Sequence, residues 1–200
     1  PAGLADIRIL LPTRRACRSL SEAFLRLSDG KPMLLPKMTP LGDIDEDELA
    51  FADDDGFGGE TAFDIPPAIS GLRRQLLLSR LILARKDSQT TPDQAARLAQ
   101  ELARLLDQVQ TERLSFDGLE KLVTGDGLSG HWQQTLEFLT ILTDNWPAIL
   151  ASEGVLDPTQ RRNQLLDTQA ALWRDKPPDG LVIAAGSTGS IPATADLLKV

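Results

Sequence analysis

The spacing of apolar residues changes along this chain, and that change limits the possible folds more than any other feature. Near both ends, a short run of apolar and β-branched residues stops at a proline or glycine and a helical pattern follows; the runs are 7–11 and 181–185. Between them, from about residue 66 to 173, apolar residues recur every three or four positions. This order predicts an α/β fold with a parallel sheet and an all-helical insertion of roughly 110 residues.

The first unit is expected to be a strand, a turn and a helix. The strand stops at Pro12, and Thr13 can cap a helix from about Arg14 to Leu27, whose apolar side chains share one face. A second strand is expected at 33–36 (Met-Leu-Leu-Pro). We therefore assign residues 1–42 to the start of the α/β core.

The helical segment is expected over residues 66–175. Leucines and isoleucines stripe a helix from about 69 to 86, and two capping patterns mark later starts, Thr91-Pro92-Asp93-Gln94 and Asp157-Pro158-Thr159-Gln160. A short helix should follow Ser115, and another should run from about 132 to 149.

The chain is expected to return to the α/β core over residues 176–200. The continuous apolar run 181–185 suits a parallel strand covered on both faces. The loop Gly186-Ser187-Thr188-Gly189-Ser190 follows, and then a helix with Pro192 near its start. Because the chain opens on Pro1 and stops soon after that last helix begins, we expect it to be an excerpt of a longer protein.

Charge is distributed unevenly over the chain. The formal net charge is −8, yet ten acids and no base lie between residues 42 and 65, and the remainder holds 19 acids and 21 bases. Residues 1–37 carry seven bases and three acids. The basic segment 1–37 is thus followed by an acidic loop, residues 43–65. We expect this loop to be disordered, because its like charges repel one another and it offers little surface to bury.

Composition excludes several kinds of site. One cysteine, Cys17, rules out an internal disulfide framework, and with a single histidine, His131, no Cys/His zinc cluster can form. No apolar run approaches the length of a membrane span. We expect a soluble, cytoplasmic protein that makes no contact with a membrane.

The loop Gly186–Ser190 is one candidate site. Glycines between a strand and a helix let backbone amides converge on a phosphate or on a DNA backbone. The loop has neither the lysine of a Walker A motif nor dinucleotide-fold glycine spacing. The alternative is a tight turn whose polar residues cap the following helix.

The turn Pro12-Thr13-Arg14-Arg15 is the other candidate, because open α/β sheets bind ligands at the carboxyl ends of their strands. Two arginines in a first helical turn oppose the helix dipole, so an anionic partner could explain them. The alternative is a solvated basic turn. We therefore name Thr13, Arg14, Arg15, Gly186, Ser187, Thr188, Gly189 and Ser190 as candidate DNA- or phosphate-binding residues.

No catalytic or metal-binding residue is expected in this chain. The alternating acids Asp43, Asp45 and Asp47 resemble the opening of a calcium loop, but Glu48 replaces its obligatory glycine. The three tryptophans fall on helical stripes, which favours core packing over base stacking. Cys17 and His131 have no evident catalytic partners, so surface or core roles are expected.

Four segments resemble the AddB family of double-strand-break repair proteins, in its alphaproteobacterial form. They are 9–16 (ILLPTRRA), 130–150, 156–163 and, most specifically, 185–194 (AGSTGSIPAT). The resemblance implies the front of one subunit of a heterodimeric helicase-nuclease that works with an AddA-type subunit on DNA ends. It implies a superfamily 1 helicase-like, P-loop-type core fragment with a helical insertion. An iron-sulfur cluster and a nuclease metal belong to the family's C-terminal domain, so no cofactor is expected here.

Departures from a working motor limit what this segment can do. The phosphate-binding loop of such a motor is missing from this chain. By the resemblance, Ala184, Ala185 and Gly186 stand roughly where a helicase presents its magnesium-binding acids. The sequence therefore favours a DNA-binding scaffold without ATPase activity, in a parent that resembles an ATP-dependent helicase/exonuclease subunit. A module that only contacts the partner helicase subunit is the alternative, and a small phosphate-binding enzyme is a third hypothesis.

Overall fold

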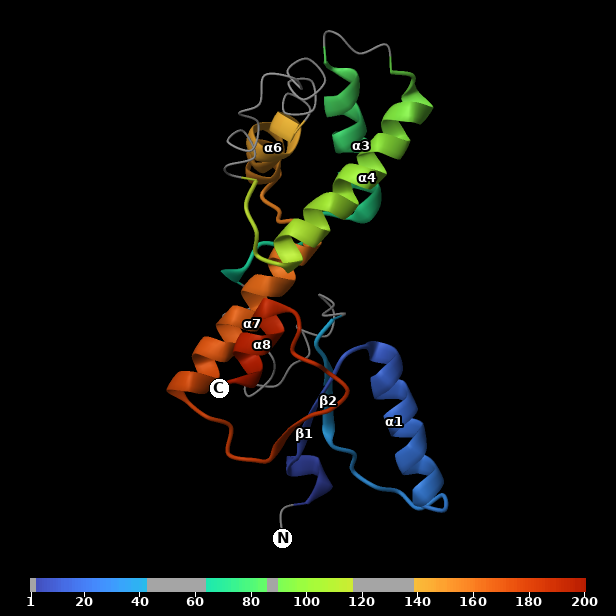
Figure 1. Ribbon diagram of the computed structural model, residues 1–200. Helices are drawn as coiled ribbons and strands as arrows, with labels where there is room; N and C mark the ends of the chain where they lie inside the picture. The colour runs from blue at the N-terminus through green and yellow to red at the C-terminus, as the bar shows by residue number, and fades with distance from the viewer. Residues whose placement is uncertain (1–2, 43–63, 86–89, 117–138) are drawn as a thin grey trace. The chain divides into compact units, whose positions relative to one another are not determined.

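The computed structural model describes residues 3–42, 64–85, 90–116 and 139–200, and is a mixed α/β structure (Figure 1). It divides into two compact units. Unit 1 comprises residues 1–65 and 162–200, and unit 2 comprises residues 66–161. The expected acidic loop, the helix after Ser115, Trp132 and His131 lie outside the described residues. No helix in the described part is long and apolar enough to cross a membrane.

Unit 1 is built on three parallel strands in the order β2-β1-β3. The central strand β1 (Arg8–Leu11) pairs with β2 (Lys37–Pro40) on one side and with β3 (Val182–Ala184) on the other. A short 3₁₀ turn, η1 (Leu4–Asp6), precedes β1. Three consecutive buried residues, Ile9, Leu10 and Leu11, make β1 the core of the sheet. The α/β class and the parallel strands are confirmed.

Helices cover both faces of this sheet (Figure 1). Helix α1 (Arg14–Leu27) connects β1 to β2 and packs on one face. On the other face, Leu10 and Leu41 form a buried cluster with side chains from α7 (Pro158–Asp175) and α8 (Pro192–Leu198), namely Leu166, Ala170, Trp173, Ala193 and Leu197. The boundary between the two units falls within α7, at residue 161, because the later part of that helix packs in this cluster.

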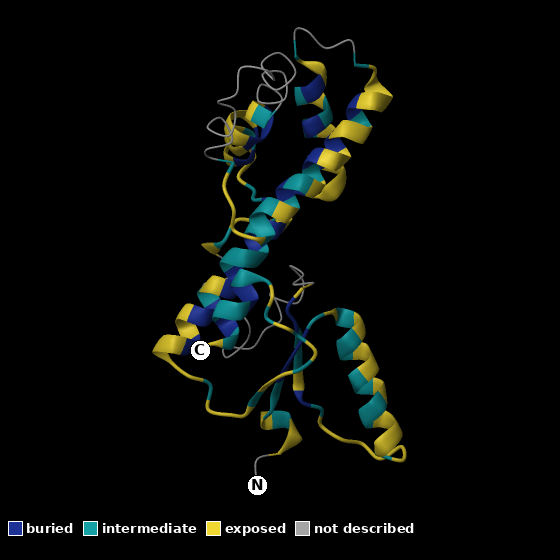
Figure 2. Ribbon diagram, in the orientation of Figure 1, coloured by how far each residue is buried: buried dark blue, intermediate teal, exposed yellow. Residues whose placement is uncertain are grey.

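Two strand predictions need correction. The second strand is 37–40 rather than 33–36, and Leu34 is 78% exposed. The run 181–185 does form the strand β3, but it is not covered on both faces, because Ile183 and Ala184 are exposed (Figure 2). Apolarity alone misplaced β2 and overestimated the burial of β3, because the central, doubly covered position belongs to β1.

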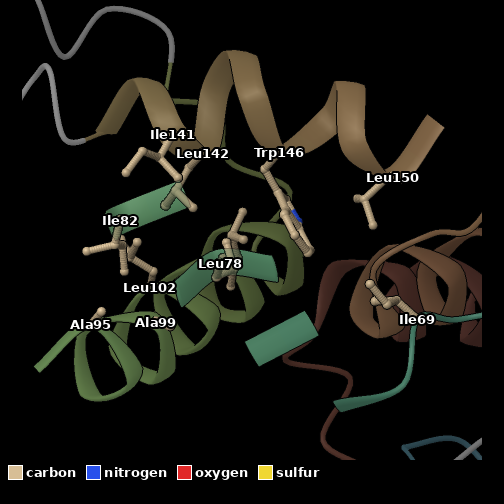
Figure 3. Close-up of a cluster of buried hydrophobic side chains, with 11 residues drawn as sticks. Ile69, Leu78, Ile82, Ala95, Ala99, Leu102, Ile141, Leu142, Trp146 and Leu150 are labelled. Atoms are coloured by element: carbon tan, nitrogen blue, oxygen red, sulfur yellow. The ribbon is translucent and has the colours of Figure 1, made fainter. Parts of the chain in front are cut away.

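Unit 2 is helical. Helices α3 (Gly71–Leu83) and α4 (Pro92–Thr111) pack side by side, and a π-helical turn, η4 (Ile141–Asn145), leads into α6 (Trp146–Glu153). Figure 3 shows Ile141, Leu142 and Trp146 directed from η4 and α6 toward Leu78 on α3 and Leu102 on α4. Gly154 ends α6 in the left-handed conformation, with φ of 66°. Helices thus occur where the spacing of apolar residues predicted them, at 71–83 and 92–111.

Candidate functional site

The carboxyl ends of all three strands meet around Pro12. Leu41 N donates to Leu11 O and Gly42 N donates to Pro12 O, at 2.7 and 3.1 Å. A Cβ added to Gly42 would lie 2.7 Å from that Pro12 oxygen, so only glycine fits there. A Cβ added to Gly186 would lie 3.5 Å from Pro12 Cδ. The turn after β1 and the glycine loop after β3 are therefore neighbours, as the parallel pairing requires.

The turn Pro12–Arg15 forms the start of α1. Thr13 is the N-cap residue, and its hydroxyl accepts a hydrogen bond from Ala16 N at 3.2 Å, which confirms the predicted cap. The side chain of Arg14 is half-buried and has an interaction partner within the chain. Arg15 is exposed, and no ion pair of Arg15 occurs within the described residues. Arg15 is thus the cation that this turn presents to solvent.

The loop Gly186–Ser190 is a compact polar turn. Gly186 and Gly189 have positive φ angles of 71° and 63°. Thr188 and Ser190 share a hydroxyl hydrogen bond of 3.2 Å, and Gly189 N donates to Ser187 Oγ at 3.4 Å. The polar residues do not cap the next helix, because the N-cap residue of α8 is Ile191 and no side chain bonds there. That part of the tight-turn interpretation is wrong.

The chemistry available at this edge is anion binding. It offers an exposed guanidinium, three hydroxyls and the amides of a glycine turn, all suited to phosphate oxygens. Helix α8 is only seven residues long, so its dipole adds little. Among the described residues no cluster of three metal-ligating side chains occurs.

A buried polar network in unit 2 escaped the sequence interpretation. Asp157 is fully buried, and its Oδ2 accepts hydrogen bonds from Trp146 Nε1 (2.9 Å) and Gln110 Nε2 (3.0 Å). Its Oδ1 lies 2.8 Å from Nε of Arg74, which also pairs with Asp107 at 2.9 Å. The Asp-Pro-Thr-Gln pattern located Asp157 as a helix start, but its partners lie far away in sequence. Through Asp157, this network connects α3, α4 and α6 with the start of α7.

The remaining candidates have structural roles where they are described. Trp146 and Trp173 lie in the two buried clusters, as predicted, with exposed fractions of 1% and 9%. Cys17 is a half-buried thiol on α1. A surface hollow of about 520 Å³ lies between α7 and α8, lined in part by Asp167, Arg174 and Lys199, away from the glycine loop.

Comparison with known proteins finds no protein-family model, no curated protein and no solved structure that matches this chain.

Proposed function

We propose that this chain is a DNA-holding scaffold in a double-strand-break repair helicase-nuclease of the AddB kind, and that it hydrolyses no ATP itself. The observation that carries the proposal is the adjacency of Pro12–Arg15 and Gly186–Ser190 at the carboxyl edge of one parallel sheet. Both turns lie within segments that resemble that family, 9–16 and 185–194. Two of the four resembling segments therefore meet at this edge.

Charge supports a phosphate ligand at this edge. Of the seven bases in residues 1–37, Arg14 and Arg15 begin α1 at this edge, whereas Arg8, Arg26 and Lys37 lie toward the other end of the strands and of α1. Sequence-independent DNA binding depends on neutralising phosphates with arginine and lysine, together with backbone amides and hydroxyls. Arg15 and the glycine loop provide both kinds of group within one edge.

The absence of ATP hydrolysis follows from the residues at the strand ends. A motor needs a lysine on the outer phosphates and acids on magnesium, and no lysine occurs in either candidate loop. The purified chain should therefore show no saturable ATP turnover. Turnover that is lost on Ser187→Ala would overturn this part of the proposal and support the small phosphate-binding enzyme instead.

The DNA role is tested with Arg14→Ala/Arg15→Ala in the full-length protein assembled with its helicase-nuclease partner. Binding to a duplex end is measured at several salt concentrations. Each lost phosphate contact should lower the log-log salt slope by about one unit. Arg26→Ala is the control, because Arg26 is exposed in the last turn of α1, far from the edge. An unchanged slope and affinity with normal assembly would contradict DNA contact here.

The second candidate function is contact with a partner protein alone, and exposed apolar groups favour it. Leu181, just before the edge strand β3, and Ile183, within it, are 58% and 37% exposed, and Leu27 is 82% exposed at the end of α1. In the same experiment, weakened assembly at constant DNA affinity would support this function rather than DNA contact.

A further inference from the structure

Three leucines form an exposed stripe along α3 in unit 2. Leu72, Leu76 and Leu83 are 71%, 56% and 41% exposed. At about 100° of rotation per residue, all three lie within about 40° of one another around the helix axis. Ser79 lies between them on the same line. The stripe therefore extends over most of the length of α3.

The packing of unit 2, over its described residues, does not use this stripe. The buried residues of α3 are Arg74, Leu78 and Ile82, which lie on a different side of the helix and contact α4, η4 and the Asp157 network. In Figure 2, exposed and buried residues both occur along α3, as an amphipathic helix requires. A contiguous exposed apolar stripe costs solubility and commonly marks an interaction surface.

Arginines border the stripe on one side. Arg73 and Arg80 lie about 80–100° from Leu72 around the axis and are both exposed. Arg73 already binds a carboxylate, because its Nε donates to Glu153 Oε2 of α6 at 2.7 Å. Arg80 has no ion pair among the described residues. The surface thus combines a row of leucines with a neighbouring row of guanidinium groups. Of these, the Arg80 guanidinium remains available to pair with a carboxylate of a partner.

We propose that the exposed face of α3 binds an acidic amphipathic helix of another protein. Its apolar residues would pack on Leu72, Leu76 and Leu83, and a glutamate or aspartate beside them would pair with Arg80. Recognition of one amphipathic helix by another through residues spaced i, i+4 and i+7 is a common mode of peptide binding. This inference goes beyond DNA holding, since none of the DNA-edge residues lies in unit 2.

The test uses the whole 200-residue chain and a synthetic helical peptide of about 20 residues, long enough to form a helix, with a leucine row flanked by glutamates. Binding is followed by fluorescence anisotropy at low and high salt. Leu72→Ser/Leu76→Ser should weaken binding at least about tenfold, and Arg80→Glu about fivefold. Exchanging the peptide's glutamates for lysines should restore binding to the Arg80→Glu chain and weaken binding to the unchanged chain.

Two control variants match these changes. Leu114→Ser removes a leucine that is 65% exposed beyond the end of α4, and Arg97→Glu reverses an exposed charge on α4. Neither should alter peptide affinity. Equal losses in the control and stripe variants, or no rescue by charge exchange, would overturn the proposal.

Two further measurements exclude other occupants. A dimer that Leu76→Ser abolishes, detected by light scattering, would assign the face to a second copy and overturn the proposal. Leu76→Cys in a Cys17→Ser background should react with a thiol reagent as fast as Leu114→Cys in that background. A slow reaction at position 76 would show that another part of this chain covers the stripe. That result would also overturn the proposal.

Discussion

Asp157 shows how one residue can hold a helical unit together. The carboxylate has no exposed surface and is paired with Arg74, whose other partner is Asp107. Removing one member of a buried ion pair leaves the other charge poorly compensated, which costs far more than breaking a pair at the surface. The pair Arg73–Glu153 in the same unit provides that surface comparison.

Asp157→Asn should lower the free energy of unfolding by about 3 kcal/mol, because Arg74 loses its buried counter-charge. Glu153→Gln should lower it by less than about 1 kcal/mol, since Arg73 is largely solvated. Urea denaturation of both variants measures the difference. Equal losses would show that the buried pair contributes no more than the exposed one.

Two glycines provide a second comparison at single residues. Gly42→Ala should destabilise the chain by about 1–3 kcal/mol, because the new methyl group meets the Pro12 carbonyl oxygen. Gly71→Ala should stabilise it by about 0.4–1 kcal/mol, since nothing lies within 4 Å of a Cβ there and alanine restricts the unfolded chain. Thermal denaturation shows which of the two variants is stabilised and which is destabilised. A Gly42→Ala variant as stable as the unchanged chain would contradict the close approach of Gly42 to Pro12.

At the scale of elements, helices were predictable from sequence and strands only in part. Thr13 and Thr91 located helix starts because caps and first-turn prolines act within a few residues. Strand β2 was misplaced because its pairing with β1, rather than its own apolarity, decides where it lies. The proximity of Pro12 and Gly186 could be predicted, because it follows from the parallel pairing of their strands. The Asp157 network could not be predicted, because its members come from four separate segments.

The start of α4 allows a prediction about pH. The Thr91 hydroxyl donates to Asp93 at 2.5 Å and lowers the pKa of that carboxyl below 3.8. A lowered folded-state pKa means that the carboxylate stabilises the helix above about pH 3.8 and that this contribution is lost as pH falls through the lowered value. Thr91→Ala should destabilise the start of α4 at neutral pH and return the pKa of Asp93 toward 3.8. Side-chain NMR titration measures that return, and an unaltered pKa would contradict the hydroxyl contact.

At the scale of the whole molecule, the charges are divided between segments of opposite sign. The basic residues near the start contribute to unit 1, and the ten acids follow them directly in the chain. A polyanion such as DNA is attracted by the basic segment and repelled by the acidic one. Salt screens both interactions over about 10 Å at moderate ionic strength. If the chain holds DNA as proposed, its net charge should affect that binding separately from the contacts at the sheet edge.

Deleting residues 45–59 removes seven acids and no base, so the formal net charge changes from −8 to −1. DNA binding by the isolated chain should strengthen several-fold at low salt and less at high salt, while the melting temperature stays nearly unchanged. Anisotropy titrations against a duplex end and thermal denaturation measure both. A melting temperature lowered by several degrees would show that the acidic segment is structural.

The strand order β2-β1-β3 also has a consequence for synthesis on the ribosome. Strand β1 can pair with β2 as soon as α1 has formed, but its other edge must wait for residues 182–184. At about 5–20 residues per second, that delay is on the order of ten seconds or more. During this interval Ile9, Leu10 and Leu11 present an open, apolar strand edge, the kind of segment that chaperones protect and that aggregates when they do not.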